Sequence, residues 1–207
     1  MIGIVDYGMG NIASVRNTLS KLCVQTIVSD QAEMLEQASH IILPGVGSFH
    51  ASIDEIEQRG LKGVIQDLAR KKPILGVCLG MQLLFSEGFE GGRKEGLDLI
   101  PGQIKRIKTD YILPHIGWNQ LHIQNEGNGF RDFEGEHVYF VHSYQVQTLA
   151  TYIVATTDYG TEIPAIVQKD NVFGMQFHPE KSGKVGLELI KMFLGVNMKH
   201  DKSYTSH

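Results

Sequence analysis

The clearest signal for chemistry in this chain is Cys78. The chain runs Gly76-Val77-Cys78-Leu79-Gly80, with an apolar run before it and a helix-forming stretch after it. This order predicts a sharp strand-to-helix turn that leaves the cysteine exposed at the helix N-terminus. Unpaired backbone N–H groups at that end favour the thiolate, which is the reactive form of the side chain. We therefore expect Cys78 to be a nucleophile.

A second segment supplies a base and a group that could orient it. The triplet His178-Pro179-Glu180 follows an apolar strand pattern at 172–177. Side chains two apart on an extended segment point to the same side, so Glu180 could accept a hydrogen bond from one ring nitrogen of His178. The other nitrogen would then face a substrate. Together with Cys78, this predicts the nucleophile, base and orienting carboxylate of a covalent hydrolase.

The loop Pro44-Gly45-Val46-Gly47 follows another predicted strand. Pro-Gly is in the first instance a turn signal. In a parallel sheet, however, this loop would lie beside the Cys78 turn, because both follow the carboxyl ends of strands. Its backbone N–H groups could then stabilise an oxyanion.

The segment His142-Ser143-Tyr144 ends the apolar strand pattern at 138–141. It is consistent with ordinary strand-end chemistry and equally with the lining of a pocket for a polar substrate. The residues alone leave both interpretations open.

The elements that would position these residues alternate between strand and helix in the first half of the chain. Their order predicts an α/β fold, an open and mostly parallel sheet with helices on both faces. Asn11 and Asp30 are candidate helix caps. The expected elements are strands at 2–5, 24–28, 40–43 and 74–77, helices after Asn11, Asp30 and Cys78, and a helical region at 49–70 broken near Gly60.

The second half is strand-rich after a glycine-rich, charged loop at 88–96. We expect one domain over 1–207, with a frayed polar tail at 198–207. The expected elements are strands at 103–108, 137–141, 153–157, 163–168 and 172–177, and a closing helix at 183–194.

Composition excludes several classes of function. Of the 207 residues, 42% are hydrophobic and 20% charged, and the net charge is −4, without a basic block. We therefore expect no nucleic-acid or membrane partner. The chain opens on a strand pattern and contains no membrane-spanning apolar run, which predicts a cytoplasmic protein. Of its two cysteines, Cys23 is expected in the core.

Two kinds of ligand site are weighed and disfavoured. Gly8-Met9-Gly10-Asn11 opens a Gly-x-Gly-x-x-Ala pattern after a strand, with Asp30 further on, which resembles a dinucleotide fingerprint. Two residues separate the strand from the first glycine, and no second substrate domain is evident. The nine histidines include none at zinc-site spacing, so we expect no metal and no cofactor.

With these motifs assembled, the chain resembles the class I (triad) glutamine amidotransferases, whose fold is flavodoxin-like. The shared pattern is Pro-Gly-x-Gly, then Gly-x-Cys-x-Gly-x-Gln, then His-Pro-Glu. Within that family it is similar to the glutaminase subunits of imidazole glycerol phosphate synthases, which serve histidine biosynthesis. The segments that carry this closer similarity are 6–11, 114–119, 139–144 and 178–181.

The resemblance implies that glutamine is the substrate and assigns roles to residues. Cys78 would attack the side-chain amide, His178 would transfer protons, and Glu180 would orient His178. Backbone N–H groups of Leu79 and of the Val46–Gly47 region would hold the oxyanion. The amino-acid end of glutamine would be held by Gln82, Glu90 and the backbone of His142, Ser143 and Tyr144.

The resemblance also implies a partner, a cyclase (β/α)8-barrel subunit that consumes the ammonia in a heterodimer. Asn11, Trp118 and Lys181 match interface positions of the family; their alternatives are a helix cap, a core aromatic and a solvated lysine. Other hypotheses are a paralogous subunit serving another amidation, a stand-alone cysteine hydrolase and a catalytically silent interaction protein.

Overall fold

The computed structural model describes residues 1–124 and 127–195. Among them, eight strands form the main sheet in the order β2-β1-β3-β4-β14-β13-β12-β9. The first five are parallel and the last three antiparallel. The parallel strands are β1 (Ile2–Val5), β2 (Thr26–Ser29), β3 (His40–Leu43), β4 (Ile74–Val77) and β14 (Val172–Met175); the others are β9 (His122–Ile123), β12 (Ile153–Asp158) and β13 (Glu162–Lys169).

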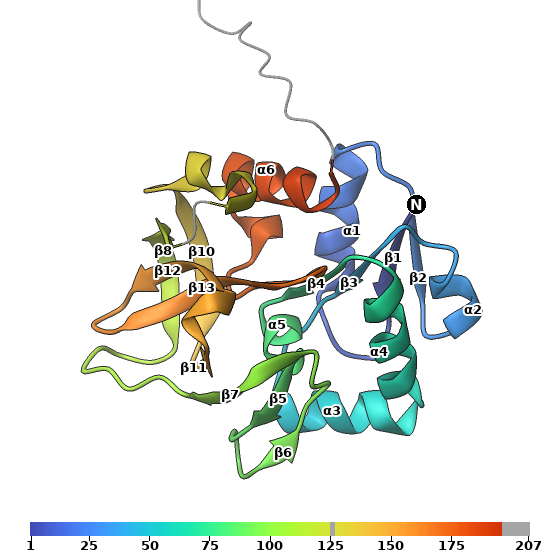
Figure 1. Cartoon of the computed structure of the whole chain (residues 1–207), viewed down its shortest axis with the longest axis horizontal. Helices are drawn as coiled ribbons and strands as arrows, with labels where there is room; N and C mark the ends of the chain where they lie inside the picture. Colours follow the sequence, from blue (N-terminus) through green and yellow to red (C-terminus); the bar gives the residue numbers. More distant parts are fainter. Residues whose placement is uncertain (125–126, 196–207) are drawn as a thin grey trace, which may run out of the picture.

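Helices cover both faces of this sheet (Figure 1). α1 (Ile12–Lys21) and α6 (Gly183–Phe193) lie on one face. The other face carries α2 (Ala32–Leu35), α3 (Phe49–Gln58), α4 (Leu61–Lys71) and α5 (Leu79–Leu83). The predicted open, mostly parallel sheet with helices on both faces is therefore confirmed, and the β2-β1-β3-β4 order is that of flavodoxin-like folds.

Alternation along the strands divides the core into two parts. On β3, Ile41 and Leu43 face the α3–α4 side, whereas Ile42 faces the α1–α6 side, and all three are at most 1% exposed. Both faces of a central parallel strand must be apolar when helices cover both. Each such side chain contributes about 1.5–3 kcal/mol on burial, so the two cores hold the strand ends in fixed positions.

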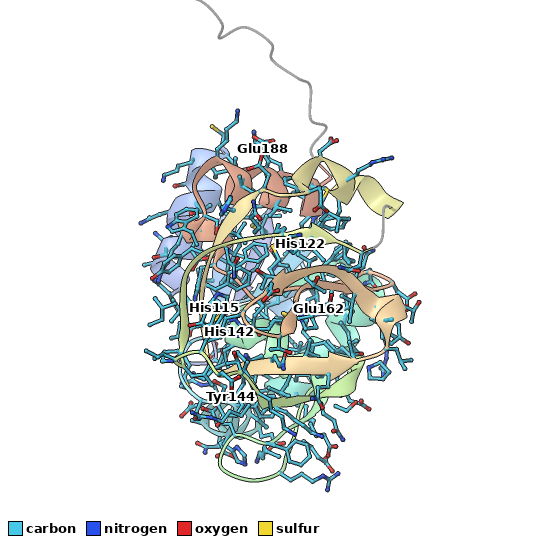
Figure 2. All side chains as sticks on the ribbon, turned by 90° about the vertical axis from the view of Figure 1, so that its left-hand side faces the viewer. His115, His122, His142, Tyr144, Glu162 and Glu188 are labelled. Atoms are coloured by element: carbon cyan, nitrogen blue, oxygen red, sulfur yellow. The ribbon has the colours of Figure 1, made fainter. Side chains whose placement is uncertain are left out.

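Two smaller sheets form the strand-rich half. One pairs β8 (His115–Gln120) with β10 (His137–His142); the other has the order β11-β7-β5-β6. Ser143 alone separates β10 from β11, so the chain passes from one sheet to the other at that residue. Figure 2 views this half. The remaining elements are β5 (Phe85–Gly88), β6 (Lys94–Glu95), β7 (Ile100–Arg106), β11 (Tyr144–Thr148), and the 3-10 turns η1 (Gly127–Phe133), η2 (Ala150–Tyr152) and η3 (Pro179–Lys181).

Several local expectations were wrong. The second strand begins at Thr26, not at Val24. The residue before α2 is Gln31, without a side-chain cap, while Asp30 forms an ion pair with Arg59 at 3.5 Å. Cys23 is exposed, because it adopts a left-handed backbone conformation (φ 55°) just after α1 and turns outward. The loop expected at 88–96 contains the short strand β6, and β5, β8, β9 and β11 were not foreseen.

The expectation of one domain over 1–207 stays a prediction, and its proposed tail at 198–207 lies outside the described residues. No helix in the part of the chain that the structure describes is long and apolar enough to cross a membrane.

Glycines allow the turn between β4 and α5 to pack directly against β3. A Cβ on Gly80 would overlap the carbonyl oxygen of Leu43, and one on Gly76 would lie 2.5 Å from the carbonyl oxygen of Gly80. These neighbours are backbone atoms, so they cannot move aside as a side-chain tip would. The turn therefore requires residues without a side chain at both positions.

We predict that Gly80→Ala destabilises the fold by about 1–3 kcal/mol, because the added methyl overpacks the turn. This corresponds to a fall in Tm of about 3–10 °C in a thermal scan. The matched control is Gly63→Ala, an exposed glycine within α4 with nothing within 4 Å of an added Cβ. That change should stabilise by about 0.5–1 kcal/mol. Equal effects of the two substitutions would contradict the packing argument.

Candidate active site

Cys78 occupies a strained position at the turn between β4 and α5. Its backbone has φ 54° and ψ −112°, in a region that side chains rarely adopt. Its N–H donates to the carbonyl of Met175 on β14 (2.8 Å), and its Sγ lies 3.7 Å from the carbonyl oxygen of Val141. The residue is 8% exposed rather than open to solvent as expected, and its remaining surface faces a cavity. Backbone strain of this kind is typical of functional sites.

His178 and Glu180 form the expected pair, but by a different local geometry. His178 Nδ1 lies 2.8 Å from Glu180 Oε1, and both side chains are at most 6% exposed. The carboxylate reaches the ring because η3 begins at Pro179 and turns the chain, not because the segment is extended. The N–H of His178 donates to the carbonyl of Tyr139 on β10 (2.9 Å), which ties the pair to the strand-rich half.

The surroundings of His178 favour its charged form. Burial by itself would lower the pKa of the ring, but hydrogen bonds and charge interactions with Cys78 and Glu180 outweigh it and raise the pKa to about 9. At neutral pH the imidazolium is thus the favoured form. Since Nδ1 is occupied by Glu180, the proton available for transfer is the one on Nε2.

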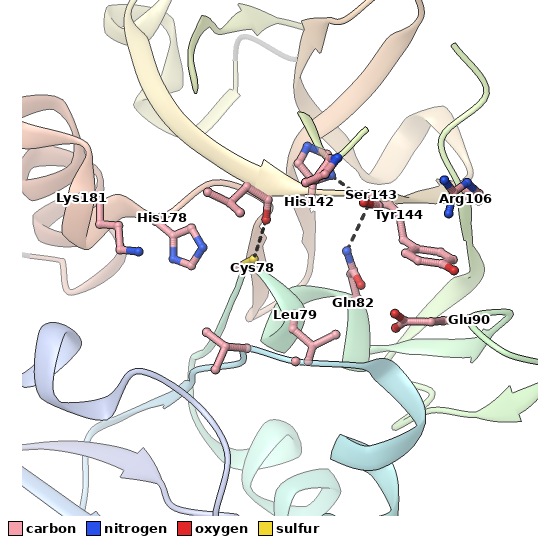
Figure 3. Close-up of a pocket in the computed structure, with 14 residues that line it drawn as sticks. Cys78, Leu79, Gln82, Glu90, Arg106, His142, Ser143, Tyr144, His178 and Lys181 are labelled. Carbon is pink, nitrogen blue, oxygen red and sulfur yellow. Dashed lines mark hydrogen bonds between the residues drawn. The ribbon is translucent and has the colours of Figure 1, made fainter. Parts of the chain in front are cut away.

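A cavity of about 500 Å³ opens beside Cys78 (Figure 3). It lies at the carboxyl ends of β3 and β4, next to the crossover from β10 to β11. The structure thus brings the predicted nucleophile, base, oxyanion and substrate-binding residues to one place. Lining residues that the sequence singled out are Val46, Gly47, Cys78, Leu79, Gln82, Glu90, His142, Ser143, Tyr144, His178 and Lys181.

The loop of the expected oxyanion donors lies directly against the Cys78 turn. A Cβ on Gly45 would overlap the backbone nitrogen of Gly80, so the two backbones touch. Gly47 has φ +100°, which a residue with a side chain rarely adopts, and Val46 is exposed at the cavity mouth. The loop therefore lies beside Cys78, where an oxyanion formed by attack of the thiolate would need N–H donors.

The far end of the cavity carries two opposite charges. Glu90 was expected there, whereas Arg106, at the end of β7, was missed by sequence reasoning. Arg106 reaches the site because Tyr144 on β11 pairs with it across the sheet. Only this tertiary pairing marks it, since nothing in its local sequence distinguishes it from a surface arginine.

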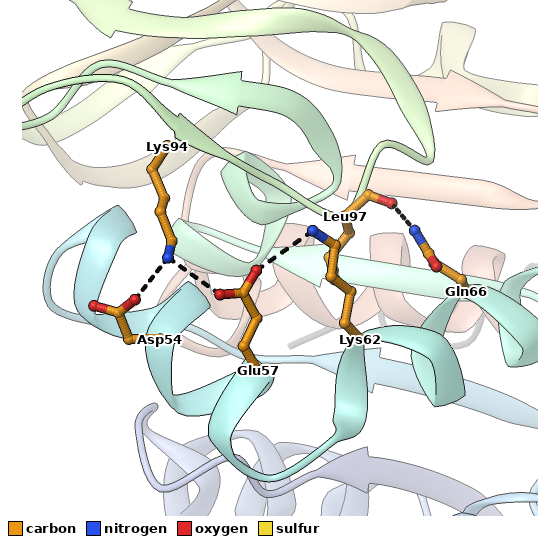
Figure 4. Close-up of polar contacts among 6 residues, drawn as sticks. All are labelled: Asp54, Glu57, Lys62, Gln66, Lys94 and Leu97. Carbon is orange, nitrogen blue, oxygen red and sulfur yellow. Dashed lines mark hydrogen bonds and ion pairs between the residues drawn. The ribbon is translucent and has the colours of Figure 1, made fainter.

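Glu90 is fixed from two directions. Its Oε2 accepts a hydrogen bond (2.7 Å) from the N–H of Phe49, the first residue of α3, where the helix dipole favours a carboxylate. Glu90 lies in the turn between β5 and β6, and β6 is held on α3 by Lys94, whose Nζ lies 2.7 Å from Asp54 and 3.1 Å from Glu57 (Figure 4). Each exposed ion pair contributes little to stability alone, but together they restrain the β5–β6 hairpin that carries Glu90.

The three residues matched to a family interface differ in their surroundings. Asn11 caps α1 by accepting from the N–H of Ser14 (3.2 Å), and it shares a small cavity with His178 and Glu180. Trp118 is 55% exposed on β8 and is therefore not the core aromatic of the alternative interpretation. Lys181 is exposed and lines the main cavity.

Comparisons with known proteins identify the family of this chain. The family model described as glutamine amidotransferase class-I matches residues 3–195. Imidazole glycerol phosphate synthase subunit HisH of Oceanobacillus iheyensis is 50% identical over 196 residues, 93% of this chain and 98% of that protein. The subunit HisH of Exiguobacterium sibiricum is 49% identical over 191 residues, covering 92% and 93%.

Solved structures share the fold at lower identity. A crystal structure of a glutamine amidotransferase superposes with a TM-score of 0.75 at 18% identity, covering 94% of this chain and 97% of that one. The structure of PurLQS from Thermotoga maritima gives a TM-score of 0.69 at 21% identity, with coverages of 94% and 97%. The family model and the near-full-length matches to the two relatives show that the chain belongs to the class-I glutamine amidotransferases and, within them, to the HisH subunits of imidazole glycerol phosphate synthase.

Proposed function

We propose that this chain hydrolyses glutamine to glutamate and ammonia with Cys78 as nucleophile, His178 as acid and base, and Glu180 as the orienting carboxylate. The observation that carries the proposal is the buried His178 Nδ1–Glu180 Oε1 hydrogen bond of 2.8 Å beside the strained Cys78. A carboxylate fixed to one ring nitrogen sets the direction in which the other transfers a proton.

The proposed reaction uses Nε2 of His178 twice, first as an acid and then as a base. The Cys78 thiolate attacks the amide carbon, and the carbonyl oxygen becomes an oxyanion held by N–H groups of Leu79 and of the Val46–Gly47 region. His178 gives its Nε2 proton to the amide nitrogen, ammonia leaves, and a thioester remains. The neutral ring then takes a proton from water as the water attacks the thioester. Glutamate leaves, and the thiolate and imidazolium are restored.

Charge at the far end of the cavity supports an amino-acid substrate. Glu90 can bind the α-ammonium group of glutamine, and Arg106 the α-carboxylate. Gln82 Nε2 donates to the carbonyl of Tyr144 (3.2 Å) and so braces the backbone at 142–144 from below. These charges support a small zwitterionic substrate, bound with its side-chain amide toward Cys78.

A partner that consumes ammonia is the second part of the proposal, in the form of a cyclase (β/α)8-barrel subunit. The relatives at 49–50% identity are named as subunits of imidazole glycerol phosphate synthase. Near the cavity, Ile116 and Trp118 on β8 are 58% and 55% exposed, and Val46 is 41% exposed. Because Ile116 and Trp118 lie two residues apart on one strand, they share a face of β8, and this exposed apolar pair supports a partner surface there. The near-full-length identity favours this partner over a paralogous amidation pathway.

The partner role predicts gated activity. Glutamate release from glutamine should be strongly stimulated by the cyclase subunit with its nucleotide ligand, and Cys78→Ala should lower stimulated release by at least about 10⁴-fold while leaving partner binding intact. Cys23→Ala, at the exposed cysteine after α1, is the matched control and should change neither quantity. High release without the partner would instead indicate a stand-alone hydrolase. Turnover retained by Cys78→Ala would exclude the nucleophile.

A pH profile tests Glu180. In the unchanged protein, kcat/KM should fall as pH rises through about 9, because the raised pKa of His178 marks loss of the Nε2 proton. Glu180→Gln removes a charge that raises that pKa, so the alkaline limb should move to lower pH and kcat should fall at least about tenfold. Glu188→Gln, which breaks the ion pair with Lys191 on α6, is the control and should leave the limb in place. An unmoved limb in Glu180→Gln would contradict the orienting role.

A further inference from the structure

Two buried histidines lie at the cavity wall, and neither side chain has a part in the proton transfers above; His142 lines the cavity, and His115 does not. His115 on β8 and His142 on β10 occupy paired positions, and they are 2% and 6% exposed. His115 Nδ1 lies 3.0 Å from His142 Nε2. Figure 2 places the two residues next to each other, with Tyr144 close by. Their contacts form a chain of hydrogen bonds that ends at the substrate-binding segment.

The hydrogen-bond partners at the two ends of this series fix which ring nitrogens donate and which accept. His142 Nδ1 lies 2.8 Å from the carbonyl oxygen of Tyr144, which can only accept, so Nδ1 carries the proton. At the other end, the Asn119 Nδ2 group donates to the carbonyl of Asp158 (2.6 Å) and lies 3.4 Å from His115 Nε2. An amide nitrogen can only donate, so His115 Nε2 accepts, and its Nδ1 donates to His142 Nε2.

This arrangement requires one proton on each ring. Burial lowers the pKa of both His115 and His142 to about 4, so both are neutral at physiological pH. A second proton on either ring would place two donors against each other. The His115 ring also cannot rotate freely, because it is stacked between Phe140 and Tyr159 at centroid distances of 4.8 and 4.0 Å.

The series of hydrogen bonds from His115 ends at the Tyr144 carbonyl, where the backbone passes from one sheet to the other. Ser143 separates β10 from β11, and the Tyr144 carbonyl just beyond it accepts from both His142 Nδ1 and Gln82 Nε2. Two donors on one carbonyl fix the plane of that peptide group. The donors come from opposite sides, one from the β8–β10 sheet and one from α5.

We propose that His115 is a positioning residue that acts through His142 and the Tyr144 carbonyl to set the backbone at 142–144 for glutamine. This rests on the proposed function, in which that backbone binds the amino-acid end of the substrate. His115 touches neither the substrate nor Cys78. Its effect therefore falls on the affinity for glutamine and not on the chemical step.

Two substitutions of His115 separate positioning from packing. His115→Phe keeps a ring between Phe140 and Tyr159 but removes the donor, and we expect KM for glutamine to rise about tenfold with kcat changed by less than about threefold. His115→Asn keeps a donor near the Nδ1 position but no ring, and should bring KM to within about threefold of the unchanged protein. His137→Phe, at the exposed start of β10, is the control and should leave KM unchanged.

We expect the two His115 variants to rank in opposite order for stability and for glutamine binding. His115→Asn loses the stacking and should be the less stable of the two, yet the better binder. If KM instead follows the unfolding midpoint across the variants, or if His115→Phe leaves KM unchanged, the positioning role is overturned.

Ring tautomers in the unchanged protein test the relay without any variant. In ¹⁵N NMR of histidine-labelled protein, His115 and His142 should both be protonated at Nδ1 and unprotonated at Nε2. An Nε2 proton on His142 would overturn the proposed positioning role, because His115 Nδ1 could not then donate to that nitrogen. These outcomes are independent of the proposed function, which fails separately if Cys78→Ala retains turnover.

Discussion

Contact between three backbone segments at the Cys78 turn is the constraint on which the site depends. Gly80 lies against the Leu43 carbonyl, and Gly45 lies against the Gly80 nitrogen, so β3, its following loop and the start of α5 meet without intervening side chains. This contact holds Cys78 at φ 54°. It also places the candidate oxyanion loop beside Cys78, because the same close approach fixes both.

The site takes residues both from the parallel strands of the main sheet and from the strand-rich part of the chain. Parallel strands β3, β4 and β14 end at one edge and bring the candidate oxyanion loop, Cys78 and the His178 segment together, as expected of a flavodoxin-like sheet. The strand-rich half supplies the opposite wall, through the crossover at Ser143 and through Arg106. His178 follows β14 of the main sheet and is tied to the strand-rich part by the hydrogen bond from its N–H to the Tyr139 carbonyl.

Site residues that belong to a short local motif could be predicted from the sequence, whereas those placed by pairing between distant strands could not. Cys78 between glycines and the His178–Glu180 pair are local patterns, and the structure brings these residues together, although Glu180 reaches the ring through a 3-10 turn. Arg106 and His115 could not be predicted, because only strand register places them beside Tyr144 and His142. Cys23 was misplaced because a single left-handed residue after α1 reverses its direction, which hydrophobicity does not reveal.

Covalent trapping tests most directly whether Cys78 attacks the side chain of glutamine. The complex of this chain with the cyclase subunit would be incubated with a glutamine analogue whose side-chain amide is replaced by a diazoketone, and the adduct mapped by mass spectrometry. We expect one adduct, on Cys78, which excess glutamine prevents and which the exposed Cys23 does not form. An adduct on Cys23, or labelling of Cys78 that glutamine does not prevent, would contradict this expectation.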